Sequence, residues 1–215
     1  GARDYSGMRS FIANAIYLAI AIAALLIYIV PYRYQLNHTV SFKETDEPLN
    51  NPLTGYAPSA DNEEECQDSQ LVYIGVTWSM WEPSQGEYDT EALEELFHIE
   101  EWKSQNKHAV LRFICDIPGE EGHKDIPEWL YEKTRDGEFY STEYGAGYSP
   151  DYSNEFFRER HALAIQALAK YCNKDDFVAY VELGSLGHWG EWHTNTDEGL
   201  EPLPDAEVCW DYVLD

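Results

Sequence analysis

Three short apolar segments alternate with helical patterns, and this alternation constrains the fold more than any other feature of the chain. The segments are residues 71–78, 109–116 and 177–184, each rich in β-branched and aromatic residues, which is typical of strands. Helices of about 15 to 20 residues are expected from residue 90 and from residue 154, because apolar side chains recur there at helical spacing. Strands that alternate with helices indicate a parallel sheet, either doubly wound or closed into a barrel.

The segments that follow these strands are aromatic and carboxylate-rich, and they lack the glycine-rich fingerprint of a nucleotide-binding sheet. Residues 126–133 are expected to form a short helix, residues 137–153 a loop rich in Gly, Tyr and Ser, and residues from 204 onward another helix. In a parallel α/β fold, functional residues collect at the carboxyl ends of the strands. The segments that follow the strands are therefore the expected location of a functional site.

Residues 11–30 form an apolar run that Asn14 alone interrupts. Such a run is about 30 Å long as a helix, which matches the hydrocarbon core of a bilayer. It is longer than the apolar region of a secretory signal and no small-residue cleavage site follows it, so we predict a retained signal anchor with a single transmembrane helix. The expected parts are a short cytoplasmic tail (1–10), the transmembrane anchor (11–30), a tether (31–50) and an extracytoplasmic, cell-surface domain (51–215).

The chain is strongly acidic, with 40 Asp and Glu against 14 Lys and Arg and a formal charge of −26. A surface this negative repels phosphate backbones, so nucleic acid is excluded as a partner. Seven Trp, sixteen Tyr and eight Phe supply ample apolar area for a core. The four cysteines are not spaced as metal ligands, and neither a metal nor a cofactor is expected.

Residues 184–194 (GSLGHWGEWHT) hold the densest group of candidate site residues, namely His188, Trp189, Glu191, Trp192 and His193. Tryptophan rings can stack on sugars, and a carboxyl group in an aromatic pocket can act as a general acid in glycoside cleavage. Packing beneath the surface is an equally well supported role for these tryptophans, and two histidines without further partners are weak evidence for a metal. After the other two strands, the candidate substrate contacts are Trp78, Trp81 and Asp116.

Strand alternation places Arg112 and Glu182 on the inner face of the sheet if Leu111 and Val181 face the helices. A buried arginine is rarely left unpaired, so an Arg112–Glu182 ion pair without a catalytic part is as well supported as a direct role. Glu82, which precedes a proline, is expected to brace a turn.

The stretch WSMWEPSQGEYD (78–89) resembles the first-strand signature of clan A glycoside hydrolases, especially the β-galactosidase-like ones, whose form is W-x-x-x-E-P-x-x-G-x-Y-D. The order of the later segments is also similar: a strand with an arginine (109–116), a Pro-Glu-Trp segment (127–129) and a Tyr-Ser-Pro-Asp-Tyr loop (148–152). The segments NPLTGYAP and GSLGHWGEWHT look closer still to uncharacterised exported bacterial proteins of the glycoside hydrolase type. The resemblance covers about residues 51–203.

This resemblance implies roles for individual residues. Glu191 is the leading candidate for the general acid/base, Glu182 is its competitor, and Arg112 matches the arginine that contacts the nucleophile. The tryptophans that would line the sugar site are Trp78, Trp129, Trp189 and Trp192.

The fold implied by the resemblance is an α/β, (β/α)8 TIM barrel. Residues 51–215 are fewer than the roughly 250 of a typical barrel and do not reach the strand that carries the nucleophile, so we expect the amino-terminal half, the first three to four βα units. The expected function is that of a membrane-anchored glycoside hydrolase of retaining type, which acts on O-glycosidic bonds of a poly- or oligosaccharide and is inactive without its nucleophile half. Because Gly190 stands where these enzymes have Asn before the acid/base, a non-catalytic carbohydrate-binding surface protein is the alternative.

Overall fold

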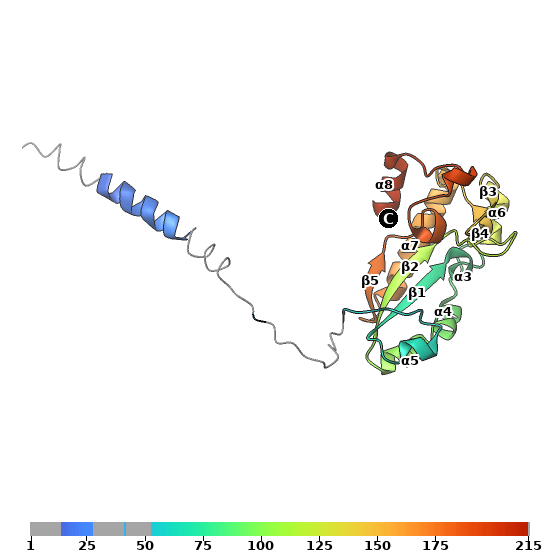
Figure 1. Cartoon of the computed structure of the whole chain (residues 1–215), viewed down its shortest axis with the longest axis horizontal. Coiled ribbons are helices and arrows are strands. Elements are labelled where there is room, and N and C mark those ends of the chain that lie inside the picture. The colour runs from blue at the N-terminus through green and yellow to red at the C-terminus, as the bar shows by residue number, and fades with distance from the viewer. Residues whose placement is uncertain (1–13, 28–40, 42–52, 215) are drawn as a thin grey trace, which may run out of the picture. The chain divides into compact units, whose positions relative to one another are not determined.

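The computed structural model describes residues 14–27, 41 and 53–214. The chain divides into two units, Gly1–Pro48 and Leu49–Asp215. In the first unit, residues 14–27 form one helix. The second unit is a mixed α/β domain, and it contains every candidate site residue (Figure 1).

Of the predicted transmembrane anchor (11–30), the structure describes the helix over residues 14–27. The remainder of residues 11–30 lies outside the described residues, as do the predicted tail and all of the predicted tether except residue 41. Within the described residues, no helix combines the length and the apolar character that crossing a membrane requires. This finding contradicts the prediction of a single transmembrane helix and of a single-pass membrane protein.

Three parallel strands form the main sheet, with β2 (His108–Ile114) between β1 (Leu71–Thr77) and β5 (Val178–Glu182). These strands confirm the three predicted from the apolar segments. The register pairs Gly75 with Arg112 and Arg112 with Glu182, so the three residues form one row across the sheet.

Helix α7 (Glu155–Cys172) covers the apolar face of this sheet. It begins where the Asn154 side chain accepts a hydrogen bond from the Phe157 backbone N–H. The residues that α7 buries, Phe157, His161, Ala164 and Leu168, recur every three or four positions, which places them on one face of the helix. Phe157 packs edge-on against the ring of Trp78 at 5.1 Å, and His161 packs against the ring of Phe113 at 5.7 Å. The polar row that contains Arg112 lies on the other face.

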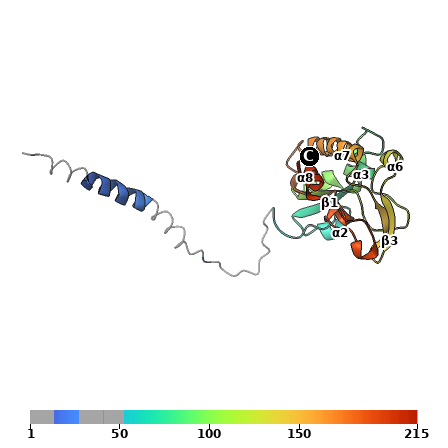
Figure 2. The ribbon, with the colours of Figure 1, turned by 90° about the horizontal axis from the view of Figure 1, so that it is seen from above.

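The other helices of this unit are α2 (Glu63–Cys66), α3 (Trp78–Trp81), α4 (Thr90–Leu96), α5 (Ile99–Ser104), α6 (Glu128–Thr134), α8 (Ala206–Leu214) and two short 3-10 turns, η1 (His188–Gly190) and η2 (Thr196–Glu198). The single helix predicted from residue 90 is broken into α4 and α5, because His98 adopts a left-handed conformation with φ of 50°. Figure 1 shows α4 and α5 near the end of the sheet where the strands begin. Figure 2 shows α7 on one side of β1 and α2 on the other.

Residues 137–153 were predicted to form a loop, but most of them form an antiparallel hairpin of β3 (Glu138–Thr142) and β4 (Gly145–Ser149). The segment after β2 extends this hairpin, because Gly119 and Ala146 exchange two backbone hydrogen bonds of 2.8 and 3.0 Å. The hairpin lies at the end of the parallel sheet where the strands finish (Figure 1).

The predicted partial (β/α)8 barrel is also wrong. The described residues form an open three-stranded parallel sheet and a separate two-stranded hairpin. At one edge, the segment Pro58–Ala60 pairs with Tyr73 of β1. At the other edge, Val181 and Leu183 remain 66% and 59% exposed. After β5, the described chain continues into η1, η2 and α8 rather than into another strand of the sheet.

Candidate functional site

Arg112 is the centre of the candidate site, because it contacts two carboxylates from different segments. Its Nε donates a hydrogen bond to Glu182 Oε2 at 2.7 Å, which confirms the ion pair expected from strand alternation. Its Nη1 donates to the backbone carbonyl of Trp189 at 3.0 Å and lies 3.5 Å from Glu191 Oε1. The Glu182 side chain is 39% exposed, so the pair stands at the surface of the sheet.

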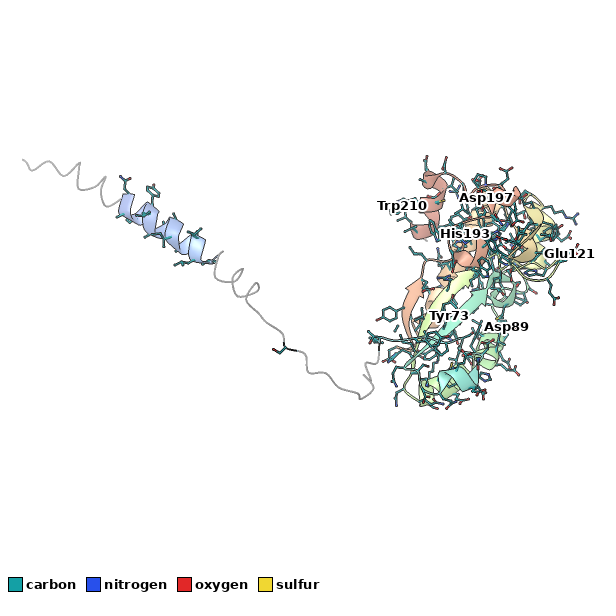
Figure 3. All side chains as sticks on the ribbon, in the orientation of Figure 1. Tyr73, Asp89, Glu121, His193, Asp197 and Trp210 are labelled. Atoms are coloured by element: carbon teal, nitrogen blue, oxygen red, sulfur yellow. The ribbon has the colours of Figure 1, made fainter. Side chains whose placement is uncertain are left out.

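A hollow of about 410 Å³ opens in front of Arg112. Its wall includes Tyr73, Trp189 and Glu191, and Gly75 contributes no side chain to the row that it shares with Arg112. The Arg112 guanidinium lies 6.0 Å from the centre of the Tyr73 ring, and Figure 3 shows Tyr73 on β1. Burial raises the pKa of Tyr73, so its hydroxyl stays protonated at neutral pH. Aromatic faces with a few convergent polar groups are typical of a small-molecule binding site.

The loop from Gly184 to Thr194 brings Trp189 and Glu191 to Arg112 through an unusual backbone. Three of its non-glycine residues, Ser185, Trp189 and Trp192, have positive φ angles of 73°, 53° and 59°. Each such conformation costs about 1–3 kcal/mol and persists only where its surroundings impose it. The concentration of three in one loop shows that the packing around this segment imposes its conformation.

A buried polar cluster holds the loop in place. His188 Nε2 accepts a hydrogen bond from the Asn195 backbone N–H at 3.3 Å, so the proton of the neutral imidazole is on Nδ1, which donates to Asp116 Oδ2 at 2.9 Å. The Tyr140 hydroxyl donates to the other oxygen of Asp116 at 2.5 Å, and the Trp189 backbone N–H donates to the Asp116 carbonyl at 2.7 Å. Burial and the charge of Asp116 raise the pKa of Tyr140, which keeps it a hydrogen-bond donor. Asp116 and His188 were predicted to contact substrate, but both are fully buried and position the loop instead.

The five tryptophans predicted to contact a sugar have different environments in the structure. Trp78 and Trp81 are at most 1% exposed and belong to the core. The indole N–H of Trp129 donates to the Glu82 carbonyl, and that of Trp192 donates to the Leu183 carbonyl, both at 2.9 Å. Of these five described tryptophans, Trp189 is the one that lines the hollow.

Glu191 lies between two cationic or potentially cationic groups. Its Oε1 is 3.5 Å from Arg112 Nη1, and its Oε2 is 3.7 Å from Nε2 of His193, the last predicted contact residue. The side chain is 53% exposed. A general acid that works near neutral pH needs an apolar pocket, and Glu191 does not have one in this structure.

Glu82 is fully buried and braces the turn that follows α3, as expected for a carboxylate before Pro83. Its Oε2 accepts the indole N–H of Trp78 at 2.8 Å, while its Oε1 accepts Gly86 N–H at 2.7 Å and Arg160 Nη2 at 2.6 Å. These partners occupy both oxygens, so the glutamate of the motif resembling a glycoside hydrolase has a structural role here.

Two residues of this region, Tyr73 and Tyr140, were not among the predicted site residues. Tyr73 was detectable, because the period of two along β1 places it on the same face as Gly75. Tyr140 was not, since it lies in a segment predicted to be a loop. The assembled site therefore combines Tyr73, Arg112, Trp189 and Glu191 around one hollow, with Glu182 beside Arg112. No protein-family model matches the chain, and no curated protein matches its sequence.

Proposed function

We propose that the hollow in front of Arg112 binds a carbohydrate. One observation carries the proposal: two aromatic residues, Tyr73 and Trp189, line the same hollow as the hydrogen-bonding side chains of Arg112 and Glu191. A sugar ring offers an apolar face to an aromatic ring and hydroxyl groups at its edge. Guanidinium and carboxylate groups form strong hydrogen bonds to such hydroxyls, because one partner of each bond is charged.

The negative charge around the hollow indicates which class of sugar it would bind. Arg112 is paired with Glu182 and Glu191, and Asp61 adds another carboxylate to the wall of the hollow. The chain as a whole has a formal charge of −26. An anionic ligand would be repelled, so the proposed ligand is a neutral poly- or oligosaccharide.

Hydrolysis of an O-glycosidic bond is the second candidate function. The observation that favours it is that Glu182 and Glu191 reach the same guanidinium from different segments, and paired carboxylates are the usual apparatus of glycoside cleavage. We place binding first because Glu191 is more than half exposed and ion-paired, unlike a general acid in an apolar pocket.

Calorimetric titration with a panel of neutral oligosaccharides tests binding. We expect Trp189→Ala to weaken the affinity for the best ligand by about tenfold or more, because an aromatic stacking face is lost. Trp210→Ala is the matched control: Trp210 is 60% exposed on α8, away from Tyr73 in Figure 3, and its loss should leave the affinity unchanged. The proposal would be contradicted if no oligosaccharide of the panel binds, or if Trp189→Ala binds the best ligand as tightly as the unmodified protein.

Assay of reducing ends released from the same oligosaccharides separates the two functions. A binding protein releases none. If the protein does cleave, Glu191→Gln should abolish release while affinity is retained, which would establish the second candidate. Loss of release in Glu182→Gln, with release kept in Glu191→Gln, would reverse the assignment of the two carboxylates.

A further inference from the structure

We propose that Glu63, His98 and Glu101 form a binding site for a divalent transition-metal ion of the zinc type. This site is separate from the hollow around Arg112. Each of the three side chains offers one ligand atom, and these atoms lie within 4.8 Å of one another.

The chemistry of the three ligands selects the metal. One imidazole nitrogen with two carboxylate oxygens is a ligand set that suits Zn²⁺, with water in the fourth position, whereas Mg²⁺ and Ca²⁺ favour oxygen alone. Tetrahedral zinc with ligands at about 2.0–2.1 Å places its donor atoms roughly 3.3 Å apart. His98 Nδ1 is already 3.5 Å from Glu63 Oε1. The site therefore needs only a small side-chain movement to close around the ion.

The backbone places the ligands together. Glu63 is in the first turn of α2, while His98 directly precedes α5 and Glu101 is in the first turn of α5. His98 is the N-cap residue of α5 and Glu101 lies in its first turn, so both ligands come from the same end of this helix. The left-handed conformation of His98 separates α4 from α5 and thereby sets the position of its ring.

Buried contacts hold the backbone of α2 and α5, which carries these side chains, in place. The Trp102 indole N–H donates to the Ala60 carbonyl at 3.0 Å, which ties α5 to the segment just before α2. Lys107 Nζ donates to the carbonyls of Cys66 and Ser69, at 2.5 and 2.7 Å, and so holds the segment after α2. The His98 ring packs edge-on against Trp102 at 6.4 Å. The ligands thus extend from a backbone that buried contacts hold in place. The His98 and Glu63 side chains are 34% and 56% exposed, so an ion can reach them.

Surrounding charge favours a cation. Residues 61–65 contain four carboxylates, and residues 91–101 contain five. Lys103, on the same helix as Glu101, is engaged by Glu100 at 3.1 Å and by Asp175 at 2.8 Å. The local field therefore attracts a divalent ion to His98, and the imidazole distinguishes this place from other acidic parts of the surface.

Titration of the full chain with Zn²⁺, followed by calorimetry, tests the proposal. We expect one saturable site per chain, and we expect His98→Gln and Glu63→Gln each to weaken its affinity by more than about tenfold, since each removes one of three ligands. Glu64→Gln is the matched control, because this neighbouring exposed carboxylate lies outside the triad, and it should leave the affinity unchanged.

Thermal unfolding provides a second measurement. Zn²⁺ should raise the unfolding midpoint of the unmodified protein and of Glu64→Gln but not that of His98→Gln, because a ligand that binds only the folded state stabilises it. The midpoints without metal show whether each variant folds. The proposal is overturned if Zn²⁺ does not saturate one site, if His98→Gln binds it as tightly as the unmodified chain, or if equimolar Mg²⁺ displaces it.

Discussion

At the scale of single residues, the hydrogen bonds of the His123 ring depend on its protonation state. Its Nδ1 is 2.6 Å from the Glu120 carbonyl oxygen and its Nε2 is 2.7 Å from the Ile117 carbonyl oxygen. Carbonyl oxygens only accept hydrogen bonds, so both ring nitrogens must carry a proton, and Asp125 at 3.3 Å offsets the resulting charge. Burial opposes that charge, but the Glu120 carbonyl, Asp125 and the Ile117 carbonyl together raise the pKa of His123 above its ordinary value.

The sign of the pH dependence follows from this raised pKa. The folded protein holds the His123 proton more tightly than the unfolded chain, so its contribution to stability is complete below the ordinary histidine pKa and is lost as pH rises through the raised value. We expect the free energy of unfolding to fall over this range by about 1 kcal/mol, roughly one hydrogen bond. Urea denaturation at a series of pH values measures it.

His123→Gln should remove this decrease, because glutamine does not titrate. His108→Gln, at another histidine that faces a single backbone carbonyl at 2.9 Å, should keep it. An unchanged pH profile in His123→Gln would show that another group is responsible. Burial also raises the pKa of Asp125, the carboxyl that lies beside His123.

Tyr140 allows a second test at the residue scale. Tyr140→Phe leaves one oxygen of the fully buried Asp116 carboxylate without its hydroxyl donor, which should lower the free energy of unfolding by about 1–3 kcal/mol. Tyr144→Phe, two residues beyond β3 and 51% exposed, should change it by less than about 0.5 kcal/mol. Chemical denaturation of the two variants compares them directly, and equal stabilities would mean that Tyr140 does not support Asp116.

At the scale of elements, the loop between β5 and η2 is folded tightly against itself. Gly187 makes a tight turn in this loop, with a φ of 73° and almost no free space: a Cβ there would lie 2.2 Å from the His193 carbonyl oxygen. His193 and His188 are joined across the same turn by a backbone hydrogen bond of 2.9 Å. The loop is therefore closely packed against itself as well as against Arg112.

Gly187→Ala should strain the backbone and also force the loop apart. Gly86→Ala is the matched control, because Gly86 has a similar φ of 81° but nothing within 4 Å of its missing Cβ. We expect the control to lose about 1 kcal/mol of stability, from backbone conformation alone, and Gly187→Ala to lose clearly more. Chemical denaturation measures both. Equal losses would show that the close approach to His193 relaxes without cost.

At the scale of the whole domain, Glu82 joins segments that are distant in sequence. Its carboxylate contacts Trp78 of α3 and Arg160 of α7, and its backbone carbonyl accepts from Trp129 of α6. Arg160 also lies over the Trp129 ring at 5.4 Å. The loss of this one charge therefore affects three helices together.

Glu82→Gln should lower the free energy of unfolding by about 3 kcal/mol or more, because it leaves Arg160 largely buried without its counter-charge. Glu87→Gln changes an exposed carboxylate five residues away and should have an effect of less than about 0.5 kcal/mol. Equilibrium urea unfolding of both variants tests this, and a small effect at Glu82 would mean that solvent reaches and compensates Arg160.

Much of the secondary structure was predictable because it follows from local periodicity. The three strands, α7 and the Arg112–Glu182 pair all agree with the sequence pattern. The hairpin β3–β4 was missed because its glycine and tyrosine residues are typical of a loop, and its pairing depends on contacts with the segment after β2. The barrel was wrong because a local pattern does not say whether a sheet closes. The predicted transmembrane anchor is contradicted because no helix among the described residues is long and apolar enough to cross a membrane.

The candidate site was predictable only in part, for the same reason. The sequence by itself determined which residues share a face of a strand, because side-chain direction alternates along the backbone. That Arg112 meets Glu182 also depends on the pairing and register of β2 and β5, which the tertiary structure decided. Only the tertiary structure decided that Trp78 and Asp116 are buried whereas Trp189 and Glu191 reach the hollow. Burial depends on packing between segments that are far apart in the chain, and a tryptophan or a carboxylate has the same local signature whether it lies in a core or faces a ligand.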